Sequence, residues 1–255
     1  MKGKLEKQHM KKLILHIPHS ATKIPIKEGF ILGDEIIENE IIKLTDWHTE
    51  ALYSSTETER IIFKYSRIFC DPERFSDDSQ EPMAKVGMGV LYEKTDDNQI
   101  MRIISSDLRD RILSEYYFKH HYNLNNAVKN QLKLHNKALI LDCHSFPDIP
   151  LKRSANKTVP RPDFNIGTDS FHTPKQLIDI SIVFFKERNF TLGVDYPFSG
   201  SIVPMKYYKK NKNVESIMLE INRKLYLKEG TNEKSENYEM TKKVVNDYIE
   251  LIKSK

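Results

Sequence analysis

The sequence has little cysteine, no long apolar run and no internal repeat. Its two cysteines, Cys70 and Cys143, stand in apolar, strand-like runs where a small buried thiol fits, so no disulfide framework is expected. No apolar stretch reaches the roughly 18 residues that a membrane span needs, and charged residues occupy the N-terminal segment where a secretory signal would be apolar. We therefore expect a soluble protein of the reducing cytoplasm, with no membrane partner.

The chain also lacks a strong excess of one charge. Lysine and arginine total 40 against 36 aspartate and glutamate residues, which gives a formal net charge of +4. A nucleic-acid-binding protein usually concentrates its basic residues on one face or helix, whereas the lysines here are scattered among acidic residues. Nucleic acid is therefore not an expected partner.

What remains is the composition of an ordinary globular protein. With 255 residues, 39% of them hydrophobic and 30% charged, the chain is long enough to bury a sizeable core. No linker or shift in composition divides it. We predict a flexible, Lys-rich lead-in over residues 1–12, followed by a single domain over residues 13–255.

Apolar runs and helix-forming stretches alternate along this domain. Strands are predicted at 13–17, 60–70, 138–143 and 214–221. Helices are predicted at 34–43, where Asp34 is able to cap, from about 45–46, within 97–136, at 174–187 and at 236–252. This alternation predicts an α/β fold of one domain, in which helices flank a mixed, mostly parallel sheet.

Two histidines stand where predicted central strands end. His19 follows the run Leu13–Ile17, and His144 follows Ala138–Cys143. In open α/β sheets, ligands gather at the carboxyl ends of the strands, and imidazole is the commonest zinc ligand. A lone histidine is usually structural, but two in this position favour one shared metal site.

A catalytic zinc ion usually has three protein ligands and one open position, so the site needs a third donor. Thr45-Asp46-Trp47-His48 offers two candidates. Asp46 is our choice and His48 the fallback, although Asp46 is equally suited to cap a helix.

Glu220 stands alone among large aliphatic residues in the predicted strand 214–221. A buried carboxylate without a partner is unfavourable, so one interpretation is an ion pair with Arg223 or another cation. The interpretation that we favour is a general base whose pKa is tuned by partial desolvation.

A set of short motifs in a fixed order extends this interpretation. They are His19-Ser20 followed by Pro25, Asp71-Pro72-Glu73-Arg74-Phe75, Gly87-Met88-Gly89-Val90, Tyr116-Tyr117 with His121, Asp142-Cys143-His144-Ser145, Pro197-Phe198-Ser199-Gly200, and Leu219-Glu220-Ile221-Asn222-Arg223. Together, from about residue 13 to residue 227, they resemble the N-formylglutamate amidohydrolase family.

The resemblance implies a fold and a set of roles. The family is related to the zinc carboxypeptidases and the aspartoacylases, which implies a zinc-carboxypeptidase-like (phosphorylase/hydrolase-like) core with one zinc ion. His19 and His144 fall on the two zinc histidines, Glu220 on the glutamate that activates water, and Arg74 on an arginine that binds the substrate carboxylate.

The chain departs from the related pattern at two positions. Carboxypeptidases have a glutamate ligand where this chain has Thr22, so Asp46 is the substitute, and Glu73 stands where relatives tend to have asparagine.

These observations predict a zinc-dependent amidohydrolase that cleaves N-formyl-L-glutamate, or a similar N-acyl amino acid, to formate and L-glutamate. One zinc ion per chain is held by His19, Asp46 and His144, and Glu220 is the base. Arg74, with Arg223 as a second candidate, binds this small-molecule substrate. The alternatives are an aminoacylase or small peptidase of the same superfamily, and a noncatalytic relative that binds an anion or a protein.

Overall fold

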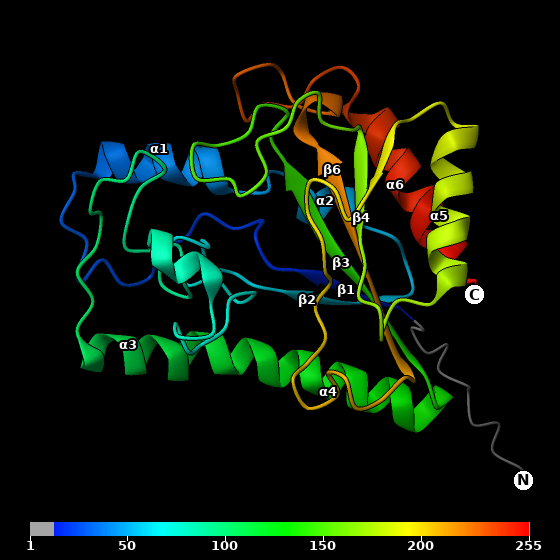
Figure 1. The fold of residues 1–255 in the computed structure, drawn as a ribbon, viewed down its shortest axis with the longest axis horizontal. Helices are drawn as coiled ribbons and strands as arrows, with labels where there is room; N and C mark the ends of the chain where they lie inside the picture. Colours follow the sequence, from blue (N-terminus) through cyan, green and yellow to red (C-terminus); the bar gives the residue numbers. More distant parts are fainter. Residues whose placement is uncertain (1–12, 255) are drawn as a thin grey trace, which may run out of the picture.

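A computed structural model describes residues 13–254, so the lead-in predicted for residues 1–12 lies outside the described residues. Strands and helices alternate along the chain (Figure 1). In chain order they are β1 (Leu13–Ile17), α1 (Asp34–Leu44), α2 (Thr49–Leu52), β2 (Thr58–Ile62), the 3-10 helix η1 (Pro82–Val86), α3 (Ser106–Ile112), the π-helix η2 (Leu113–Tyr117), α4 (Phe118–His135), β3 (Ala138–Phe146), β4 (Phe164–Gly167), α5 (Lys175–Glu187), β5 (Leu192–Val194), β6 (Val214–Asn222), the 3-10 helix η3 (Arg223–Leu225) and α6 (Tyr238–Lys253).

The strands form one six-stranded sheet in the order β2-β1-β3-β6-β4-β5. Every neighbouring pair is parallel except β4 with β6, which is antiparallel. Strands β3 and β6 lie at the centre and are buried along nearly their whole length, as their apolar sequences require. The predicted α/β class with a mixed, mostly parallel sheet is confirmed.

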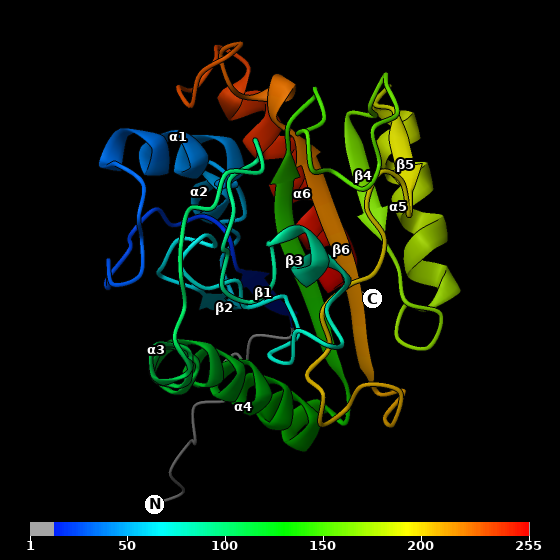
Figure 2. The same cartoon turned by 60° about the vertical axis from the view of Figure 1, so that its left-hand side comes forward.

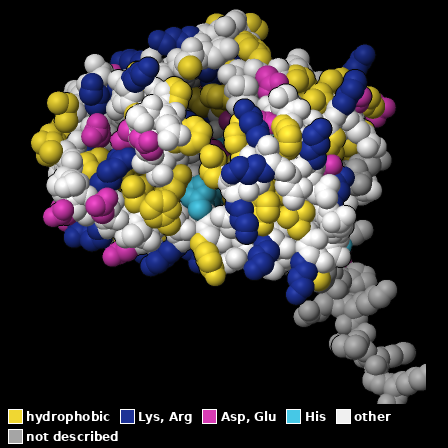
Figure 3. All heavy atoms as spheres, turned by 60° about the horizontal axis from the view of Figure 1, so that its bottom comes forward, with side chains coloured by type: hydrophobic (Ala, Val, Ile, Leu, Met, Phe, Trp, Pro, Cys, Tyr) yellow, Lys and Arg dark blue, Asp and Glu magenta, His cyan; other side chains and the backbone are white. Residues whose placement is uncertain are grey.

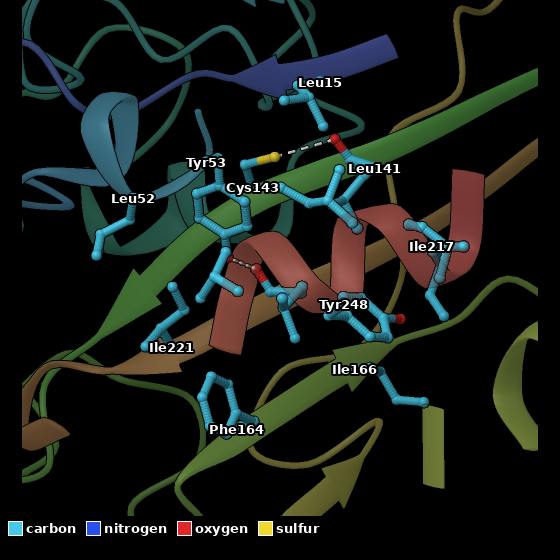
Figure 4. Close-up of a cluster of buried hydrophobic side chains, with 14 of the residues drawn as sticks. Leu15, Leu52, Tyr53, Leu141, Cys143, Phe164, Ile166, Ile217, Ile221 and Tyr248 are labelled. Carbon is cyan, nitrogen blue, oxygen red and sulfur yellow. Dashed lines mark hydrogen bonds between the residues drawn. The ribbon is translucent and has the colours of Figure 1, made fainter. Parts of the chain in front are cut away.

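Helices cover both faces of the sheet (Figures 1 and 2). On one face, α2, α5 and α6 pack on alternate side chains of the strands, among them Leu15, Leu141 and Ile217 (Figure 4). The hydroxyl of Tyr53, which follows α2, lies 2.7 Å from the carbonyl oxygen of Leu219 and 3.0 Å from that of His144. On the opposite face, α4 packs on the other set of alternating residues. The two faces therefore divide the side chains of each central strand.

Strand boundaries differ from the prediction in three ways. The strand predicted at 60–70 is the shorter β2, because the chain turns over residues 66–70 with Phe69 and Cys70 donating to the Ser66 carbonyl. Strand β3 continues three residues beyond the predicted end and so includes His144. The short strands β4 and β5 were not predicted, since three or four residues give too little periodicity.

The predicted helices exist, but some of their predicted caps and first residues differ from those observed. Gly33, not Asp34, is the N-cap of α1, and the Asp34 carboxylate is paired with Lys27 instead. The helix predicted from 45–46 begins only at Thr49. The helical stretch predicted from residue 97 begins at Ser106, because the Ser105 hydroxyl accepts from the Leu108 N–H and caps it there.

The structure also bears on the two cysteines and on membrane-spanning helices. Cys70 and Cys143 are buried and form no disulfide, as predicted. Within residues 13–254, no helix has both the length and the apolar character that crossing a membrane requires.

Candidate active site

The site lies on the face of the sheet that α4 covers. It lies past the part of the sheet that α4 contacts, toward the carboxyl ends of the central strands. On this face β3 presents Ala138, Ile140, Asp142 and His144 in alternation. The first two pack against α4, whereas the last two lie past the aliphatic cluster. Strand β6 runs beside β3 in parallel register, with His144 opposite Glu220. The strand period of two therefore separates the aliphatic half of this face from a polar half.

His19, Asp46 and His144 converge in this polar half. The Nδ1 atoms of the two histidines are 3.3 Å apart. The Oδ2 atom of Asp46 lies 3.1 Å from Nδ1 of His144 and 3.6 Å from Nδ1 of His19. All three side chains are buried. They come from the loop after β1, the connection between α1 and α2, and strand β3, so only the tertiary fold brings them together.

This donor set fits a zinc ion. Zn–N bonds of about 2.0 Å in a tetrahedron place neighbouring ligand atoms about 3.3 Å apart, close to the separations observed here. The three ligand atoms all lie within 4.8 Å of one another. Two imidazoles and one carboxylate are also a ligand set that leaves one position open.

The electrostatics of the cluster also favour positive charge between the three groups. Burial lowers the pKa of both imidazoles, but nearby carboxylates reverse this: Asp71 and Asp46 for His19, and Glu73 and Asp142 for His144, so both pKa values lie above the usual range. Burial raises the pKa of Asp46, yet hydrogen bonds from His144 and His19 outweigh it and lower that pKa below its usual value.

Further side chains hold the two imidazole rings in place. His19 Nε2 donates to an Asp71 carboxylate oxygen at 2.9 Å, and the other oxygen of Asp71 accepts from Arg67 and from the Tyr92 hydroxyl, each at 2.9 Å. Nε2 of His144 lies 3.1 Å from an oxygen of Asp142, close enough for an ion pair but without hydrogen-bond geometry. Carboxylates in this position fix the ring orientation of metal-binding histidines, and they leave each Nδ1 directed at the shared centre.

Glu220 stands beside this cluster without a partner of its own. Its side chain is 7% exposed, and its Oε2 atom has no hydrogen-bond partner. Burial is the main cause that raises its pKa to about 7, and the charge of Asp46 adds to it, against His144 and Arg223. The alternative ion pair with Arg223 does not form, since that guanidinium is turned toward Asp46 at 3.0 Å.

Arg74 lies in a cavity of about 470 Å³ that adjoins the cluster. Its Nε atom is buried, has no hydrogen-bond partner and lies 3.7 Å from an oxygen of Asp71. Arg223, the second predicted substrate anchor, is instead hydrogen-bonded to the Lys43 carbonyl, to Ser145 and to Asp46. Its position suits holding Asp46 more than binding a substrate.

The fold thus brings five of the predicted site residues into one cluster and Arg74 into the adjoining cavity, and their roles stay predictions. His48 lies elsewhere: it precedes α2 with φ 61° and its Nε2 is bonded to the Asn232 carbonyl. The N-cap alternative for Asp46 is wrong, because the residue before α2 is His48.

Sequence reasoning missed a buried extension of the cluster. His16 Nδ1 lies 2.8 Å from Asp142, and its Nε2 lies 2.8 Å from Nε2 of His120. Glu73 Oε2 also approaches His144 Nε2 at 3.1 Å. The spacing of Asp142 and His144 by two residues on a strand was the available signal, because it places both side chains on one face.

An α/β sheet with imidazoles, carboxylates and a partnerless glutamate at the carboxyl ends of its central strands has the layout of an enzyme that performs acid-base chemistry on a small molecule. Comparison with protein families identifies which enzyme class this is. The sequence profile of the N-formylglutamate amidohydrolase family matches residues 11–227, and the chain belongs to that family, which places it among the hydrolases.

Two solved structures share the fold. An N-formylglutamate amidohydrolase from Ralstonia eutropha JMP134 superposes with a TM-score of 0.84 at 21% identity, over 96% of this chain and 94% of that one. A gene product from Agrobacterium tumefaciens superposes with a TM-score of 0.67 at 15% identity, over 95% of this chain and 90% of that one. Comparison with curated protein sequences found no significant match.

Proposed function

We propose that this protein is a zinc-dependent amidohydrolase that cleaves N-formyl-L-glutamate, or a similar N-acyl amino acid, to the free acid and the amino acid. The products from N-formyl-L-glutamate would be formate and L-glutamate. The observation that carries the proposal is the convergence of three ligand-type atoms, 3.1 to 3.6 Å apart, beside a buried glutamate with an unpaired oxygen. Membership of the amidohydrolase family supports it.

His19, Asp46 and His144 would hold one zinc ion. When bound, zinc supplies a Lewis acid that polarises the acyl oxygen and lowers the pKa of water toward about 7. Asp71 keeps the His19 imidazole oriented through a hydrogen bond, Asp142 lies beside the His144 imidazole as an ion-pair partner, and Arg223 holds Asp46 through its 3.0 Å contact.

Glu220 is the general base in this proposal. Its free Oε2 takes a proton from the attacking water, and the oxygen of that water forms a bond to the acyl carbon. The C–N bond then breaks, and Glu220 returns the proton to the departing amine nitrogen. In the metal-free protein, burial raises the pKa of this carboxyl group to about 7. A base whose pKa lies near the working pH can both accept and return a proton.

Arg74 would bind the substrate carboxylate. Its guanidinium lies in the wall of the adjoining cavity. A planar guanidinium contacts a carboxylate through two parallel hydrogen bonds, which fixes the orientation of the substrate as well as its position.

The test combines metal analysis with an assay for formate release. Purified protein should contain about one zinc per chain and hydrolyse an N-formyl amino acid, and His144→Ala should lose both properties. His48→Asn is the matched control, because His48 lies outside the cluster and asparagine tolerates its positive φ. Full zinc occupancy in His144→Ala would contradict the assigned ligands, and a folded protein that binds no zinc would favour a noncatalytic binding role.

A further inference from the structure

A second group of ligand-type atoms lies at the other nitrogen of the His144 ring. It consists of Nδ1 of His16, Nε2 of His144 and carboxylate oxygens of Glu73 and Asp142. One ligand atom from each of His16, Glu73 and Asp142 lies within 4.8 Å of the other two. The two histidines and Asp142 are buried, and the Glu73 side chain is 18% exposed. The group shares His144 with the proposed zinc site but does not include His19 or Asp46.

The separations in this group are close to those around a coordinated ion. Nε2 of His144 lies 3.1 Å from Oε2 of Glu73 and 3.1 Å from Oδ1 of Asp142. Nδ1 of His16 lies 2.8 Å from the same Oδ1 and 3.6 Å from Oε1 of Glu73. Ligand atoms about 2.0–2.2 Å from a tetrahedral ion lie about 3.3–3.6 Å apart. Three of the four separations lie in or just below that range, and the shortest is a hydrogen bond whose proton an ion would replace.

His144 gives an independent sign of a ligand in this group. Its side chain is only 3% exposed, and its Nε2 atom has no hydrogen-bond partner although two carboxylate oxygens lie 3.1 Å away. An N–H group that donates a hydrogen bond points at its acceptor. Here the two oxygens lie off that axis, as the other ligands of an ion do when the ion itself lies on the axis.

His120 supports His16 as a ligand. Nε2 of His16 lies 2.8 Å from Nε2 of His120, which is buried as well. A neutral imidazole has one donor nitrogen and one acceptor nitrogen, so one ring donates in this contact and the other accepts. His16 can therefore donate from Nε2 while its Nδ1 carries no proton. An outer partner of this kind fixes the tautomer and the orientation of a metal-binding imidazole.

An ion can reach this group through the cavity that contains Arg74. Glu73 and Asp142 both line that cavity of about 470 Å³. Phe75 and Met205 also line it and are 42% and 58% exposed, so the cavity extends to the surface. The molecular face on the α4 side has apolar patches between basic side chains, with a histidine in a hollow among them (Figure 3). An ion held by the two carboxylates stands in the cavity wall.

We propose that this group is a second metal site, which binds a divalent transition-metal ion such as zinc. Its ligands are His16, Glu73, Asp142 and His144. Two imidazole nitrogens with two carboxylate oxygens suit zinc or cobalt, whereas magnesium and calcium prefer oxygen ligands alone. The His144 imidazole bridges the two sites, with Nδ1 directed at the first and Nε2 at the second, and the proton on Nε2 passes to solvent.

The second site is the weaker of the two. An ion there must displace the hydrogen bond between His16 and Asp142 as well as the proton on His144 Nε2. Two bonds of about 2.0 Å that diverge from one imidazole ring put the ions more than about 4 Å apart, so no single water bridges them to offset their repulsion. The first ion is therefore retained during purification, and the second binds when zinc is added.

The test follows zinc binding to the full-length protein after its metal has been removed with a chelator. Calorimetry gives the affinities, and metal analysis after dialysis against zinc gives the number of bound ions. The parent protein should bind about two ions per chain, the second at least about 10-fold more weakly than the first. Both binding events should persist in a large excess of magnesium, and loss of the weaker one there would contradict the proposed ligands.

A charge-neutral variant assigns the weaker event to this group. Glu73→Gln removes a ligand of the second site alone, so the weaker event should disappear and the stronger one remain. Glu81→Gln is the matched control and should keep both events, because Glu81 lines the same cavity but accepts from the backbone of Phe75 and Met83. Unchanged binding in Glu73→Gln, or the same loss in both variants, would overturn the proposal.

Asp46→Asn separates this site from the site in the proposed function. Asp46 belongs to the first site alone, so this variant should lose the stronger event and keep the weaker one. A single ion that Glu73→Gln removes and Asp46→Asn retains would support the second site and contradict the proposed zinc ligands. A single ion with the opposite behaviour would overturn the second site and leave the proposed function standing. If the parent protein binds no zinc, both are wrong.

Discussion

Replacing Glu220 by glutamine separates three roles that this residue could have. If Glu220 is the general base, glutamine keeps its shape but cannot accept a proton, so zinc should stay bound while kcat falls roughly 100-fold or more. If Glu220 were a zinc ligand, zinc affinity would fall first. If it had only a structural role, turnover would persist in the folded fraction.

The same substitution has an effect on stability whose size follows from the structure. Burial raises the pKa of Glu220 from 4.5 to about 7, so the folded state binds this proton more tightly than the unfolded chain. Ionising the folded protein therefore costs stability as pH rises from 4.5 to about 7, and the cost is complete above pH 7. At about 1.4 kcal/mol for each pKa unit, it reaches at most about 3 kcal/mol.

Glutamine does not ionise and so avoids this cost. In metal-free protein, Glu220→Gln should match the parent protein near pH 4.5 and exceed its free energy of unfolding near pH 8, which urea titrations at both pH values measure. Zinc content and kcat are determined on the same preparation. A zinc-loaded variant with near-normal kcat would refute the mechanism, and a stability difference independent of pH would refute the assigned burial of the charge.

Three further substitutions test other parts of the structure. Arg74→Lys keeps the charge but loses the planar guanidinium, so KM should rise several-fold at constant zinc content, and unchanged kinetics would transfer the anchor role to another arginine. Asp71→Asn weakens the acceptor for His19 Nε2, so zinc affinity by competitive chelation should fall about 10- to 100-fold, and an unchanged affinity would contradict the orienting role. Gly167→Ala puts a Cβ atom 2.2 Å from a backbone oxygen and should lower the free energy of unfolding by about 1–3 kcal/mol. Gly33→Ala has nothing within 4 Å of the added Cβ atom, so in the same denaturation assay it should show only the loss from a poorer N-cap of α1, about 1 kcal/mol or less.

Much of the fold followed from local patterns. The run Leu13–Ile17 is long enough and apolar enough to predict β1 with its observed bounds, and α5 was predicted to within one residue of its start. The errors have local causes as well. Ser105 delays a helix that composition alone would begin earlier, and β5 is too short to have a period.

For the site, the sequence determined which residue types stand at the ends of the apolar runs. His19, His144 and Glu220 were recognisable because a polar side chain that interrupts or ends a buried strand needs a reason to be there. Their order with the other short motifs was enough to recognise the family.

Only the tertiary structure decided how these residues combine. Asp46 was equally plausible as a helix cap, and what distinguishes the two roles is the 3.1 Å approach to His144, 98 positions away in sequence. Arg223 was a candidate anchor until its guanidinium was seen to bond Asp46, and Asp71 and Glu73 gained their importance from contacts with the two imidazoles. Side-chain chemistry is a property of each residue, whereas partners, burial and the resulting pKa values depend on which segments the sheet brings together.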